Sequence, residues 1–387
     1  MRYAILGTGR QGLASAYDIA RFGGADEIIL MDNRPDAVSN GAQKLNSLLD
    51  TQIVSGKVVD VTSEDNLASE FRNVDALLAA VPYKYLPKLT EIAIQTRTHM
   101  VDLGGHTNNA RKQIAMSGQA KEAGITIVPE CGMGPGMNIT LAIAAMEQMD
   151  SPEHVSIWDG GLPQKPTPPW NYSLFFNING LTNEYDGSAF FLDQGKITQV
   201  PCFERIETLE FPEPIGNLEA AVTSGGLSTM PWTFEGKILT LENKTLRYPG
   251  HWEWMKGFRQ LGLFSENPVS FQGQEITPRE FYHQLLEPQL DHGRVEDVCL
   301  MRVRATGNHQ GSPKTVTINS IEYSDQETGF SAMEKWTGWH ASIMLIHAAQ
   351  GKLEKGVIPV ENAMKGSTFI AEAKQRKFDI RLETTEG

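Results

Sequence analysis

The stretch that decides the fold is Y-A-I-L-G-T-G-R-Q-G, residues 3–12. Its first four residues are an apolar run, and a helical pattern follows the stretch as far as residue 22. Asp32 closes the next apolar run, twenty positions after the last glycine. The glycines of the G-x-G-x-x-G turn are Gly7, Gly9 and Gly12. A strand, such a turn, a helix and a distal acidic residue predict a dinucleotide-binding βαβ unit.

Each glycine of the turn has a mechanical reason. Gly7 permits the tight turn, Gly9 lets a pyrophosphate approach the backbone, and Gly12 lets the helix pack close to the strand. The helix begins at Arg10 and Gln11, whose end of the helix offers free N–H groups and a partial positive charge to phosphates. The turn therefore predicts a nucleotide cofactor.

Asp32 narrows the choice of cofactor. Its carboxylate can accept hydrogen bonds from both ribose hydroxyls, and it would repel a 2′-phosphate, which favours NAD over NADP. Arg34 leaves NADP open, because an arginine at this place can bind a 2′-phosphate. Asp60 ends an expected third strand, where it either meets the adenine or caps a turn. Three residues at the end of the fourth strand are expected near the nicotinamide ribose: Ala80, Val81 and Pro82.

Strand and helix patterns alternate over the first 130 residues. The short apolar runs that predict strands are 3–6, 27–32, 57–60, 76–81, 100–103 and 126–129. Runs of this kind are typical of parallel strands buried on both faces. One helix is expected over 11–22 and another over 107–124, with Thr107 as its N-cap. The fold class is thus α/β, with a Rossmann-type doubly wound parallel sheet.

The pattern changes after residue 136. Four prolines between 163 and 169 exclude a helix there and indicate a structured loop. Strands are expected over 297–305 and 315–323, and a buried helix over 336–350. We therefore expect a Rossmann domain over 1–136, an α+β substrate and oligomerisation domain with a mixed sheet over 137–332, and a segment, 333–387, that packs back on the first domain.

Composition excludes some functions. The net charge is −13 and no basic run exists, which argues against a nucleic-acid partner. No apolar stretch reaches the roughly 20 residues that span a bilayer, so no membrane association is expected. The three cysteines lack metal-site spacing, so we expect no metal site and a reducing cytoplasm. The first strand leaves no room for a signal peptide.

Two glycine-rich segments follow strands at the carboxyl edge of the expected sheet, where open α/β sheets bind ligands. They are V-D-L-G-G-H, 101–106, and V-P-E-C-G-M-G-P-G-M, 128–137. They supply the titratable side chains Asp102, His106 and Glu130. Structural roles stay open for each: Asp102 as the cap of a turn, His106 as a loop residue, and Glu130 as an ion-pair partner.

Four segments together resemble the saccharopine dehydrogenase-like family, and within it the lysine 6-dehydrogenases most. They are V-D-L-G-G-H, P-E-x-G-x-x-P-G-M, T-S-G-G-x-S-T (223–229) and T-L-R-Y-P-G-H (245–251). The last two lie in the second domain and do not follow from nucleotide binding. The resemblance extends to about residue 359 and implies the same fold, with an inserted substrate domain, as well as a homo-oligomer built through that domain's sheet.

The resemblance also implies an activity, the NAD-dependent oxidative deamination of the ε-amine of L-lysine. The products would be ammonia and allysine, which cyclises to piperideine-6-carboxylate. The alternatives are a dehydrogenase of saccharopine or of another diamino acid such as 3,5-diaminohexanoate. Saccharopine has a third carboxylate and should need an extra cation. A non-catalytic NAD-binding regulator is the alternative of another class.

This chemistry needs a base that deprotonates an ammonium group of pKa about 10.4. His251 joins the three residues named above as a candidate, and the order among the four stays open. Arg247 is the expected partner of the substrate carboxylate, unless it pairs with an acidic neighbour inside its own sheet. The remaining candidates for substrate contact are Thr223, Ser224 and Tyr172, which follows the proline loop. Glu253 is either an ammonium ligand or surface.

Overall fold

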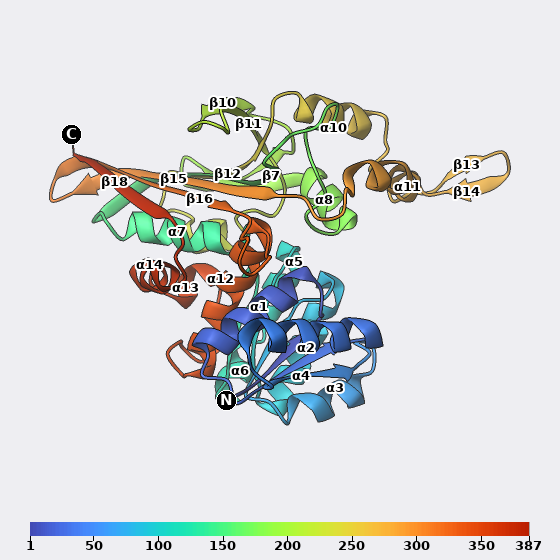
Figure 1. Cartoon of the computed structure of the whole chain (residues 1–387). Helices are drawn as coiled ribbons and strands as arrows, with labels where there is room; N and C mark the ends of the chain where they lie inside the picture. Colours follow the sequence, from blue (N-terminus) through green and yellow to red (C-terminus); the bar gives the residue numbers. More distant parts are fainter. Residues whose placement is uncertain (387) are drawn as a thin grey trace.

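The computed structural model describes residues 1–386, which form two large sheets and a small hairpin, joined by helices (Figure 1). The first sheet has seven parallel strands in the order β17-β6-β5-β4-β1-β2-β3. Its strands are β1 Arg2–Leu6, β2 Glu27–Asp32, β3 Val54–Val58, β4 Ala76–Ala79, β5 His99–Asp102, β6 Thr126–Val128 and β17 Gly356–Val357. The strand order reverses between β1 and β4, as in doubly wound folds, and the predicted Rossmann-type sheet is confirmed.

Two predicted boundaries in this part of the chain are wrong. The third strand was expected over 57–60, but β3 covers Val54–Val58, so Asp60 lies in the loop beyond it. β3 is the edge strand and four of its five residues are exposed, which removes the apolar run that marks an inner strand. The helix expected over 107–124 is two helices separated by a turn at 115–116, and His106 takes the N-cap position in place of Thr107.

Helices cover both faces of the first sheet. They are α1 Arg10–Phe22, α2 Pro35–Leu49, α3 Glu64–Phe71, the 3₁₀ turn η1 Tyr83–Tyr85, α4 Leu86–Thr96, α5 Thr107–Ile114 and α6 Ser117–Glu122. The break before α6 leaves the Ser117 hydroxyl as hydrogen-bond acceptor for the Val357 N–H of β17, at 3.1 Å.

The second sheet is mixed, as predicted, and nine strands form it. They are β7 Ser151–Pro163, β8 Ser188–Asp193, β9 Lys196–Pro201, β10 Glu207–Glu210, β11 Asn217–Val222, β12 Thr240–Arg247, β15 Asp297–His309, β16 Ser312–Tyr323 and β18 Ile380–Glu386. β7 and β12 run parallel, whereas the other pairs are antiparallel. Side chains at Asn243, Thr245 and Arg247 of β12 therefore share the face that carries Ile157 and Asp159 of β7.

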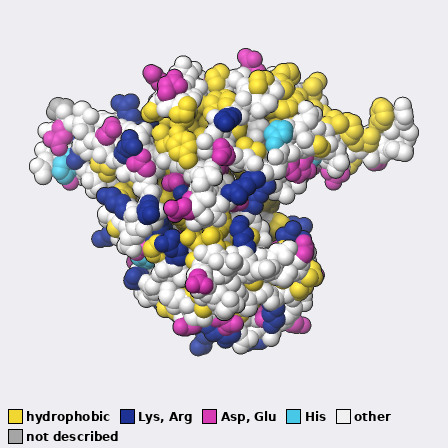
Figure 2. All heavy atoms as spheres, viewed as in Figure 1, with side chains coloured by type: hydrophobic (Ala, Val, Ile, Leu, Met, Phe, Trp, Pro, Cys, Tyr) yellow, Lys and Arg dark blue, Asp and Glu magenta, His cyan; other side chains and the backbone are white. Residues whose placement is uncertain are grey.

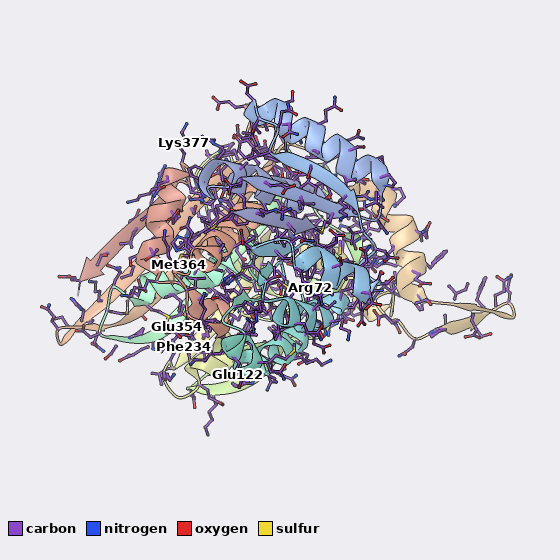
Figure 3. All side chains as sticks on the ribbon, turned by 90° about the horizontal axis from the view of Figure 1, so that it is seen from below. Arg72, Glu122, Phe234, Glu354, Met364 and Lys377 are labelled. Atoms are coloured by element: carbon purple, nitrogen blue, oxygen red, sulfur yellow. The ribbon has the colours of Figure 1, made fainter. Side chains whose placement is uncertain are left out.

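The remaining helices connect or flank the two sheets. They are α7 Met137–Met146, α8 Ile178–Tyr185, α9 Met230–Phe234, α10 His251–Gln260, α11 Pro278–Leu290, α12 Ala332–Ala349, α13 Val360–Ala363 and α14 Gly366–Gln375. A hairpin of β13 Val269–Phe271 and β14 Gln274–Ile276 projects from the body in both views (Figures 1 and 3). Hydrophobic side chains gather on the surface along this hairpin and around α10, where Trp254 is 46% exposed (Figure 2).

The end of the chain serves both sheets. α12 begins at a capping box of Ser331 and Glu334, so it starts earlier than the predicted residue 336. The expectation that residues 333–387 return to the first domain is wrong for the last strand. β18 pairs with β16 in the second sheet, from Lys314 opposite Glu386 to Ser320 opposite Ile380. In the described part of this segment, the short β17 is the one strand that joins the first sheet, beside β6.

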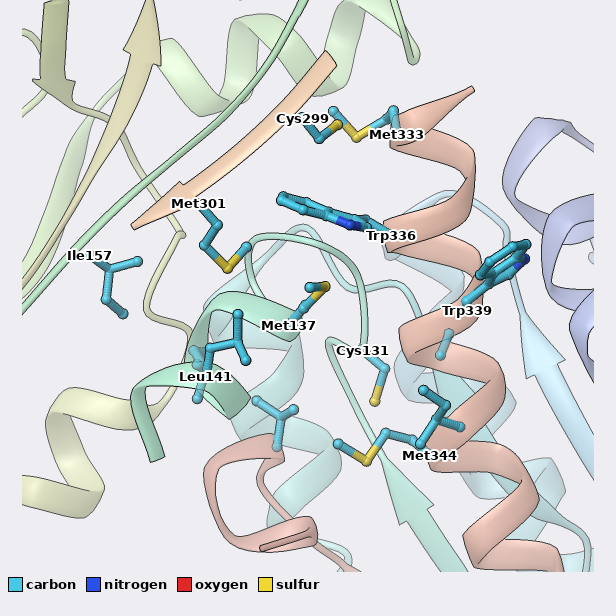
Figure 4. Packing of buried hydrophobic residues seen from close by; sticks show 14 of the residues in the cluster. Cys131, Met137, Leu141, Ile157, Cys299, Met301, Met333, Trp336, Trp339 and Met344 are labelled. Carbon is cyan, nitrogen blue, oxygen red and sulfur yellow. The ribbon is translucent and has the colours of Figure 1, made fainter. Parts of the chain in front are cut away.

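A shared core holds the two sheets around α12. Trp336 is fully buried and points toward Met301 of β15 and Met137 of α7, whereas Trp339 points to the other side of the helix (Figure 4). There Trp339 stacks on Tyr17 of α1, with ring centroids 6.3 Å apart. The two sheets therefore pack together through one continuous core. Among the described helices, none is both long and apolar enough to cross a membrane.

Candidate active site

The phosphate-binding turn has the geometry that its glycines predicted. Gly7 has φ +101°, and a Cβ there would lie 2.2 Å from the carbonyl oxygen of Ala80. A Cβ at Gly12 would lie 2.0 Å from the carbonyl oxygen of Gly7. A Cβ at Gly9 would meet no heavy atom within 4 Å, so the space above this residue is open. The turn is therefore tightly packed at Gly7 and Gly12, and it is unobstructed at Gly9, where a pyrophosphate would approach.

A cleft opens directly at this turn. It is lined by Gly9, Arg10, Gln11, Gly12, Ala80, Leu103, the segment 174–177, Glu287 and Asp291. The side-chain oxygen of Gln11 is buried there and has no hydrogen-bond partner among residues 1–386. The Arg10 guanidinium reaches the carbonyl oxygen of Leu174 at 3.5 Å, which links the turn to the proline-rich loop. Open space above Gly9 and an unpaired amide oxygen beside it fit a bound dinucleotide.

Asp32 stands at the carboxyl end of β2, beside the turn. One carboxylate oxygen accepts the Thr8 N–H at 2.9 Å, and the other accepts the Arg34 backbone N–H and Nε, both at 3.1 Å. Burial opposes ionisation, but the hydrogen bonds from Arg34 and Thr8 hold the pKa of Asp32 below its usual value. Arg34 is thus paired with Asp32, and the Asp32 carboxylate stays ionised next to the turn.

The other predicted cofactor residues divide into two groups. Ala80 donates its N–H to the Leu6 carbonyl at 2.7 Å and lines the cleft, with Val81 and Pro82 following in the same loop. Asp60 is exposed and accepts hydrogen bonds from the N–H and hydroxyl of Thr62, both at 2.8 Å. The structure therefore gives Asp60 the turn-capping arrangement, one of its two predicted alternatives.

Asp102 is a fully buried carboxylate that organises the carboxyl edge of the first sheet. One oxygen accepts the N–H groups of Gly104 and Glu130, each at 2.9 Å, and the other accepts the Gln113 amide at 2.8 Å. Burial raises the pKa of Asp102 to about 6. With both oxygens engaged by the protein, Asp102 fixes the loop of Gly104 and the backbone of Glu130.

Glu130 follows β6 in a left-handed conformation, with φ +60°, and its side chain is 1% exposed. Its carboxylate accepts the His106 N–H at 3.2 Å and the hydroxyl of Ser228, which comes from the second domain. Burial, together with the nearby Asp102 charge, raises the pKa of Glu130 to about 7. A Cβ at Gly104 would lie 2.4 Å from Glu130 Cγ, so the glycine loop is shaped around this carboxylate.

His106 is exposed at the start of α5. Its ring stacks on Tyr83 with centroids 5.1 Å apart and an interplanar angle of 15°. The Tyr83 hydroxyl accepts the amide of Asn183 from α8, at 3.2 Å. Asp102, His106 and Glu130 are therefore brought together, as predicted from their strand ends, and Asn183 and Ser228 bring the second domain to the same edge.

Arg247 lies in the second domain and is 2% exposed. Its Nε donates to the Tyr185 hydroxyl at 2.8 Å, and its Nη2 lies 3.5 Å from Oε1 of Glu184. The guanidinium also lies over the Tyr172 ring, 4.7 Å from its centroid. Arg247 thus has an acidic neighbour, although this neighbour comes from α8 and not from the sheet.

The three other residues predicted to contact the substrate also lie in the second domain. The Thr223 hydroxyl shares a 2.7 Å hydrogen bond with the hydroxyl of Thr245, which lies 3.1 Å from Glu184. Ser224 donates its hydroxyl to the Asn183 carbonyl at 2.6 Å, so this hydroxyl is engaged in holding α8. Tyr172 is 2% exposed, and its hydroxyl has no hydrogen-bond partner in the described chain.

His251 belongs to this second group and not to the edge that carries Glu130. Its ring nitrogens lie 3.0 Å from the Tyr185 hydroxyl and 3.1 Å from the Trp170 carbonyl oxygen. Burial, with the Arg247 charge, lowers its pKa to about 3. A neutral imidazole with both nitrogens engaged positions Tyr185 and the proline-rich loop, which disfavours the predicted acid–base role. Glu253 is exposed on α10.

The two domains of the chain each match a known family domain. Residues 3–128 match the saccharopine dehydrogenase NADP binding domain, and residues 132–377 match the saccharopine dehydrogenase C-terminal domain. The second match alone covers more than half of the 387 residues. The chain belongs to the saccharopine dehydrogenase family. The predicted family and α/β fold are thereby confirmed, and the first domain is an NAD(P)-binding one.

Two relatives in this family illustrate how far the similarity extends. The saccharopine dehydrogenase [NADP(+), L-glutamate-forming] of Pyricularia oryzae is 24% identical over 290 residues, covering 72% of this chain and 60% of that protein. The mitochondrial alpha-aminoadipic semialdehyde synthase of Rattus norvegicus is 25% identical over 251 residues, covering 62% of this chain and 26% of that protein. The chain therefore spans less than two thirds of either relative.

Solved structures share the fold over almost the whole chain. Apo saccharopine dehydrogenase (L-Glu forming) from Saccharomyces cerevisiae has a TM-score of 0.77 at 17% identity, covering 99% of each chain. Homospermidine synthase from Legionella pneumophila, in complex with NAD, has a TM-score of 0.65 at 12% identity, covering 99% of this chain and 91% of that one.

Three polar residues of the site were not predicted from the sequence: Asp159, Glu184 and Ser228. Asp159 is 5% exposed on β7, and one of its oxygens accepts the Asn243 amide at 2.7 Å. The signal for Asp159 was present, because a charged residue breaks the apolar face that Val155 and Ile157 begin. Within residues 1–386, no group of His, Cys, Asp and Glu side chains could hold a metal ion, and the three cysteines are buried and free.

Proposed function

We propose that the chain is an NAD-dependent dehydrogenase that deaminates a diamino acid, with the ε-amine of L-lysine as the leading substrate. The charge content of the second-domain site carries this choice. Asp159 and Glu184 face the same region as a single arginine, Arg247. L-Lysine has two ammonium groups and one carboxylate, which complements that charge pattern.

Saccharopine fits the same site less well. It has three carboxylates, and the second-domain cluster offers them Arg247, whose guanidinium already lies beside Glu184. Bringing additional carboxylates next to Asp159 and Glu184 would place like charges together at low solvent exposure, which is strongly unfavourable. A dehydrogenase of another diamino acid, such as 3,5-diaminohexanoate, remains the second candidate because it satisfies the same charge pattern.

NAD is the cofactor that the first domain supports best, and it would accept a hydride from the amine-bearing carbon. The phosphate-binding turn would hold its pyrophosphate, and Asp32 would accept the ribose hydroxyls. The Asp32 carboxylate, secured by Thr8 and Arg34, would lie next to a 2′-phosphate and repel it. The charge on Asp32 outweighs Arg34 as a phosphate ligand because the arginine is engaged by that same carboxylate.

Glu130 is the residue that we assign to proton transfer. The substrate ammonium must lose a proton before hydride can leave its carbon, and a water must then add to the resulting imine. Overall, the ammonium substrate, NAD and water give the aldehyde, ammonium, NADH and one proton. With a pKa of about 7, Glu130 can accept a proton and release it at neutral pH. Asp102 accepts a hydrogen bond from the Glu130 backbone N–H, and Ser228 donates one to the Glu130 carboxylate.

Incubation of the protein with NAD and a panel of amino acids tests the function, with NADH followed by absorbance. We expect turnover with L-lysine and none with saccharopine. Turnover with a different diamino acid alone would replace lysine as the substrate. If no member of the panel yields NADH and the protein nevertheless binds NAD tightly, the non-catalytic regulator would be favoured.

Replacing Asp32 tests the cofactor. Asp32→Ala removes the charge that opposes a 2′-phosphate and frees Arg34, so the ratio of kcat/KM for NAD to that for NADP should fall by about 10- to 100-fold, the effect of one charged hydrogen-bond partner. Steady-state kinetics with both cofactors give this ratio. Asp60→Ala is the control, because the Asp60 carboxylate is engaged by Thr62 in a turn, and it should leave the ratio unchanged. An unaltered ratio in Asp32→Ala would remove Asp32 from the ribose site.

The homo-oligomer and the cytoplasmic location expected from sequence stay predictions, as does the absence of nucleic-acid and membrane partners. Sedimentation of the purified protein at several concentrations would give the oligomeric state directly.

A further inference from the structure

Asp159 is a buried carboxylate with an incomplete set of partners. It lies on the inner face of β7, opposite Thr245 of β12 in the register of the two strands. One oxygen accepts the Asn243 amide, while Oδ2 receives no hydrogen bond and the carboxylate pairs with no cation within residues 1–386. Burial raises its pKa to about 7, the Glu184 charge adds to this effect, and the Arg247 charge opposes it. A carboxylate so deeply buried without a cation in direct contact is costly unless a ligand supplies one.

A glycine lies directly against the Asp159 carboxylate. Gly134 lies in the segment that follows Glu130, and a Cβ at this position would lie 2.3 Å from Asp159 Oδ2. Gly134 is itself exposed and lies four residues after Glu130, so Oδ2 of Asp159 contacts the segment that follows the first sheet. A larger residue at 134 would clash with the carboxylate and displace it.

A second, independent observation points to a ligand in the same region. The Tyr172 hydroxyl is buried and has no hydrogen-bond partner in the described chain, although a buried hydroxyl normally has one. Its ring packs on the guanidinium of Arg247, and its hydroxyl lies within the electrostatic influence of both Arg247 and Glu184. Of the two Glu184 carboxylate oxygens, it is likewise one, Oε1, that accepts hydrogen bonds within residues 1–386, from Thr245 and Arg247.

We propose that Asp159, Glu184 and the Tyr172 hydroxyl bind a second ammonium group of the substrate, distinct from the amine that is oxidised. This inference rests on the proposed function and identifies the group that selects the substrate. Arg247 lies beside this ammonium subsite and would take the carboxylate, so the pair would recognise the ammonium and carboxylate of one α-amino-acid head group. The reacting amine at the far end would then reach the edge that carries Glu130.

The test compares two substrates on one variant. L-Lysine has the second ammonium group, whereas 6-aminohexanoate lacks it and retains the carboxylate and the reacting amine. Asp159→Asn should lower kcat/KM for L-lysine by about 10- to 100-fold, as expected for the loss of a hydrogen bond to a charged group. It should leave the already low kcat/KM for 6-aminohexanoate unchanged. Equal losses for both compounds would overturn the proposal, because a general disturbance of the site has that effect.

The matched control is Glu242→Gln. Glu242 lies on β12 and accepts the Ser156 hydroxyl of β7 at 3.1 Å, so it occupies the same two strands on the opposite face. This variant should retain wild-type kinetics with both substrates. A loss with L-lysine as large as that of Asp159→Asn would show that the strand pair, and not the ammonium subsite, is responsible.

Calorimetry with 1,5-diaminopentane separates this inference from the proposed function. The diamine carries two ammonium groups and no carboxylate, and its binding to the NADH complex needs no turnover. Binding to the wild type that weakens at least about 10-fold in Asp159→Asn would support the subsite even if no amino acid were oxidised. Equal affinity for both proteins would overturn the subsite while leaving the dehydrogenase activity standing. No binding and no turnover with the wild type would overturn both.

Discussion

Glu130→Gln should lower kcat for the amine substrate by about 10²- to 10⁴-fold, the range that general acid–base catalysis contributes. The amide has nearly the same shape and can keep contacts to His106 and Ser228, but it cannot take a proton. The affinity for NAD should be unchanged, because Glu130 lies at the ends of β5 and β6 and not at the phosphate-binding turn. Stopped-flow measurement of NADH formation together with NAD titration checks both statements.

The pH dependence sharpens this prediction. Because the pKa of Glu130 is raised to about 7, the carboxylate that accepts a proton is lost as the pH falls below that value. In the wild type, kcat/KM should therefore rise as the pH increases through about 7. Any effect of the substrate ammonium on kcat/KM is separate and comes at higher pH. Glu130→Gln should lose this limb of the profile. A variant that keeps both the limb and most of its kcat would exclude Glu130 as the base.

Glu361→Gln is the control for a buried carboxylate in the same neighbourhood. Glu361 accepts the hydroxyls of Thr229 and Thr233, and burial raises its pKa as it does for Glu130. Within residues 1–386 no hydrogen bond joins Glu361 to the loop of Gly104 or to His106, and its charge is the smallest of the causes that shift the pKa of Glu130. Its replacement should affect stability more than kcat, which distinguishes loss of a base from loss of a buried polar network.

The sequence predicted those parts of the fold whose physical cause is local. The G-x-G-x-x-G turn works through backbone conformation at Gly7 and close contacts at Gly12, and both requirements are visible in residue identity. β3 and β18 were misplaced because edge strands need no continuous apolar run. The pairing of β18 with β16 joins residues 380–386 to 314–320, and no local pattern in either segment specifies that contact.

The candidate site divides in the same way. Asp102, His106 and Glu130 could be grouped because the carboxyl ends of parallel strands share one edge. Asp159 and Glu184 could not, because they come from a strand and a helix that meet Arg247 only in the folded second domain. Glu253 was considered as an ammonium ligand from its position near the P-G-H segment, but it lies exposed on α10.

Arg247→Ala should raise KM for L-lysine by a factor of roughly 30 to several thousand, the effect of about 2–5 kcal/mol when one partner of a buried charge pair is removed. The guanidinium is held by Tyr185 and packed on Tyr172, so its direction is fixed before the substrate carboxylate arrives. kcat should fall less, because Arg247 lies away from the reacting edge. Steady-state kinetics separates the two parameters, and urea unfolding measures the accompanying loss of stability.

Two comparisons isolate the carboxylate contact from that structural loss. Arg247→Lys retains the charge but not the planar fork of donors, so its KM should lie between those of the wild type and the alanine variant. 1,5-Diaminopentane has no carboxylate, so its binding to the NADH complex should respond to Asp159→Asn and not to Arg247→Lys. If Arg247→Lys weakened the diamine as much as L-lysine, Arg247 would be a structural partner of Glu184 alone, and the substrate carboxylate would have to bind elsewhere.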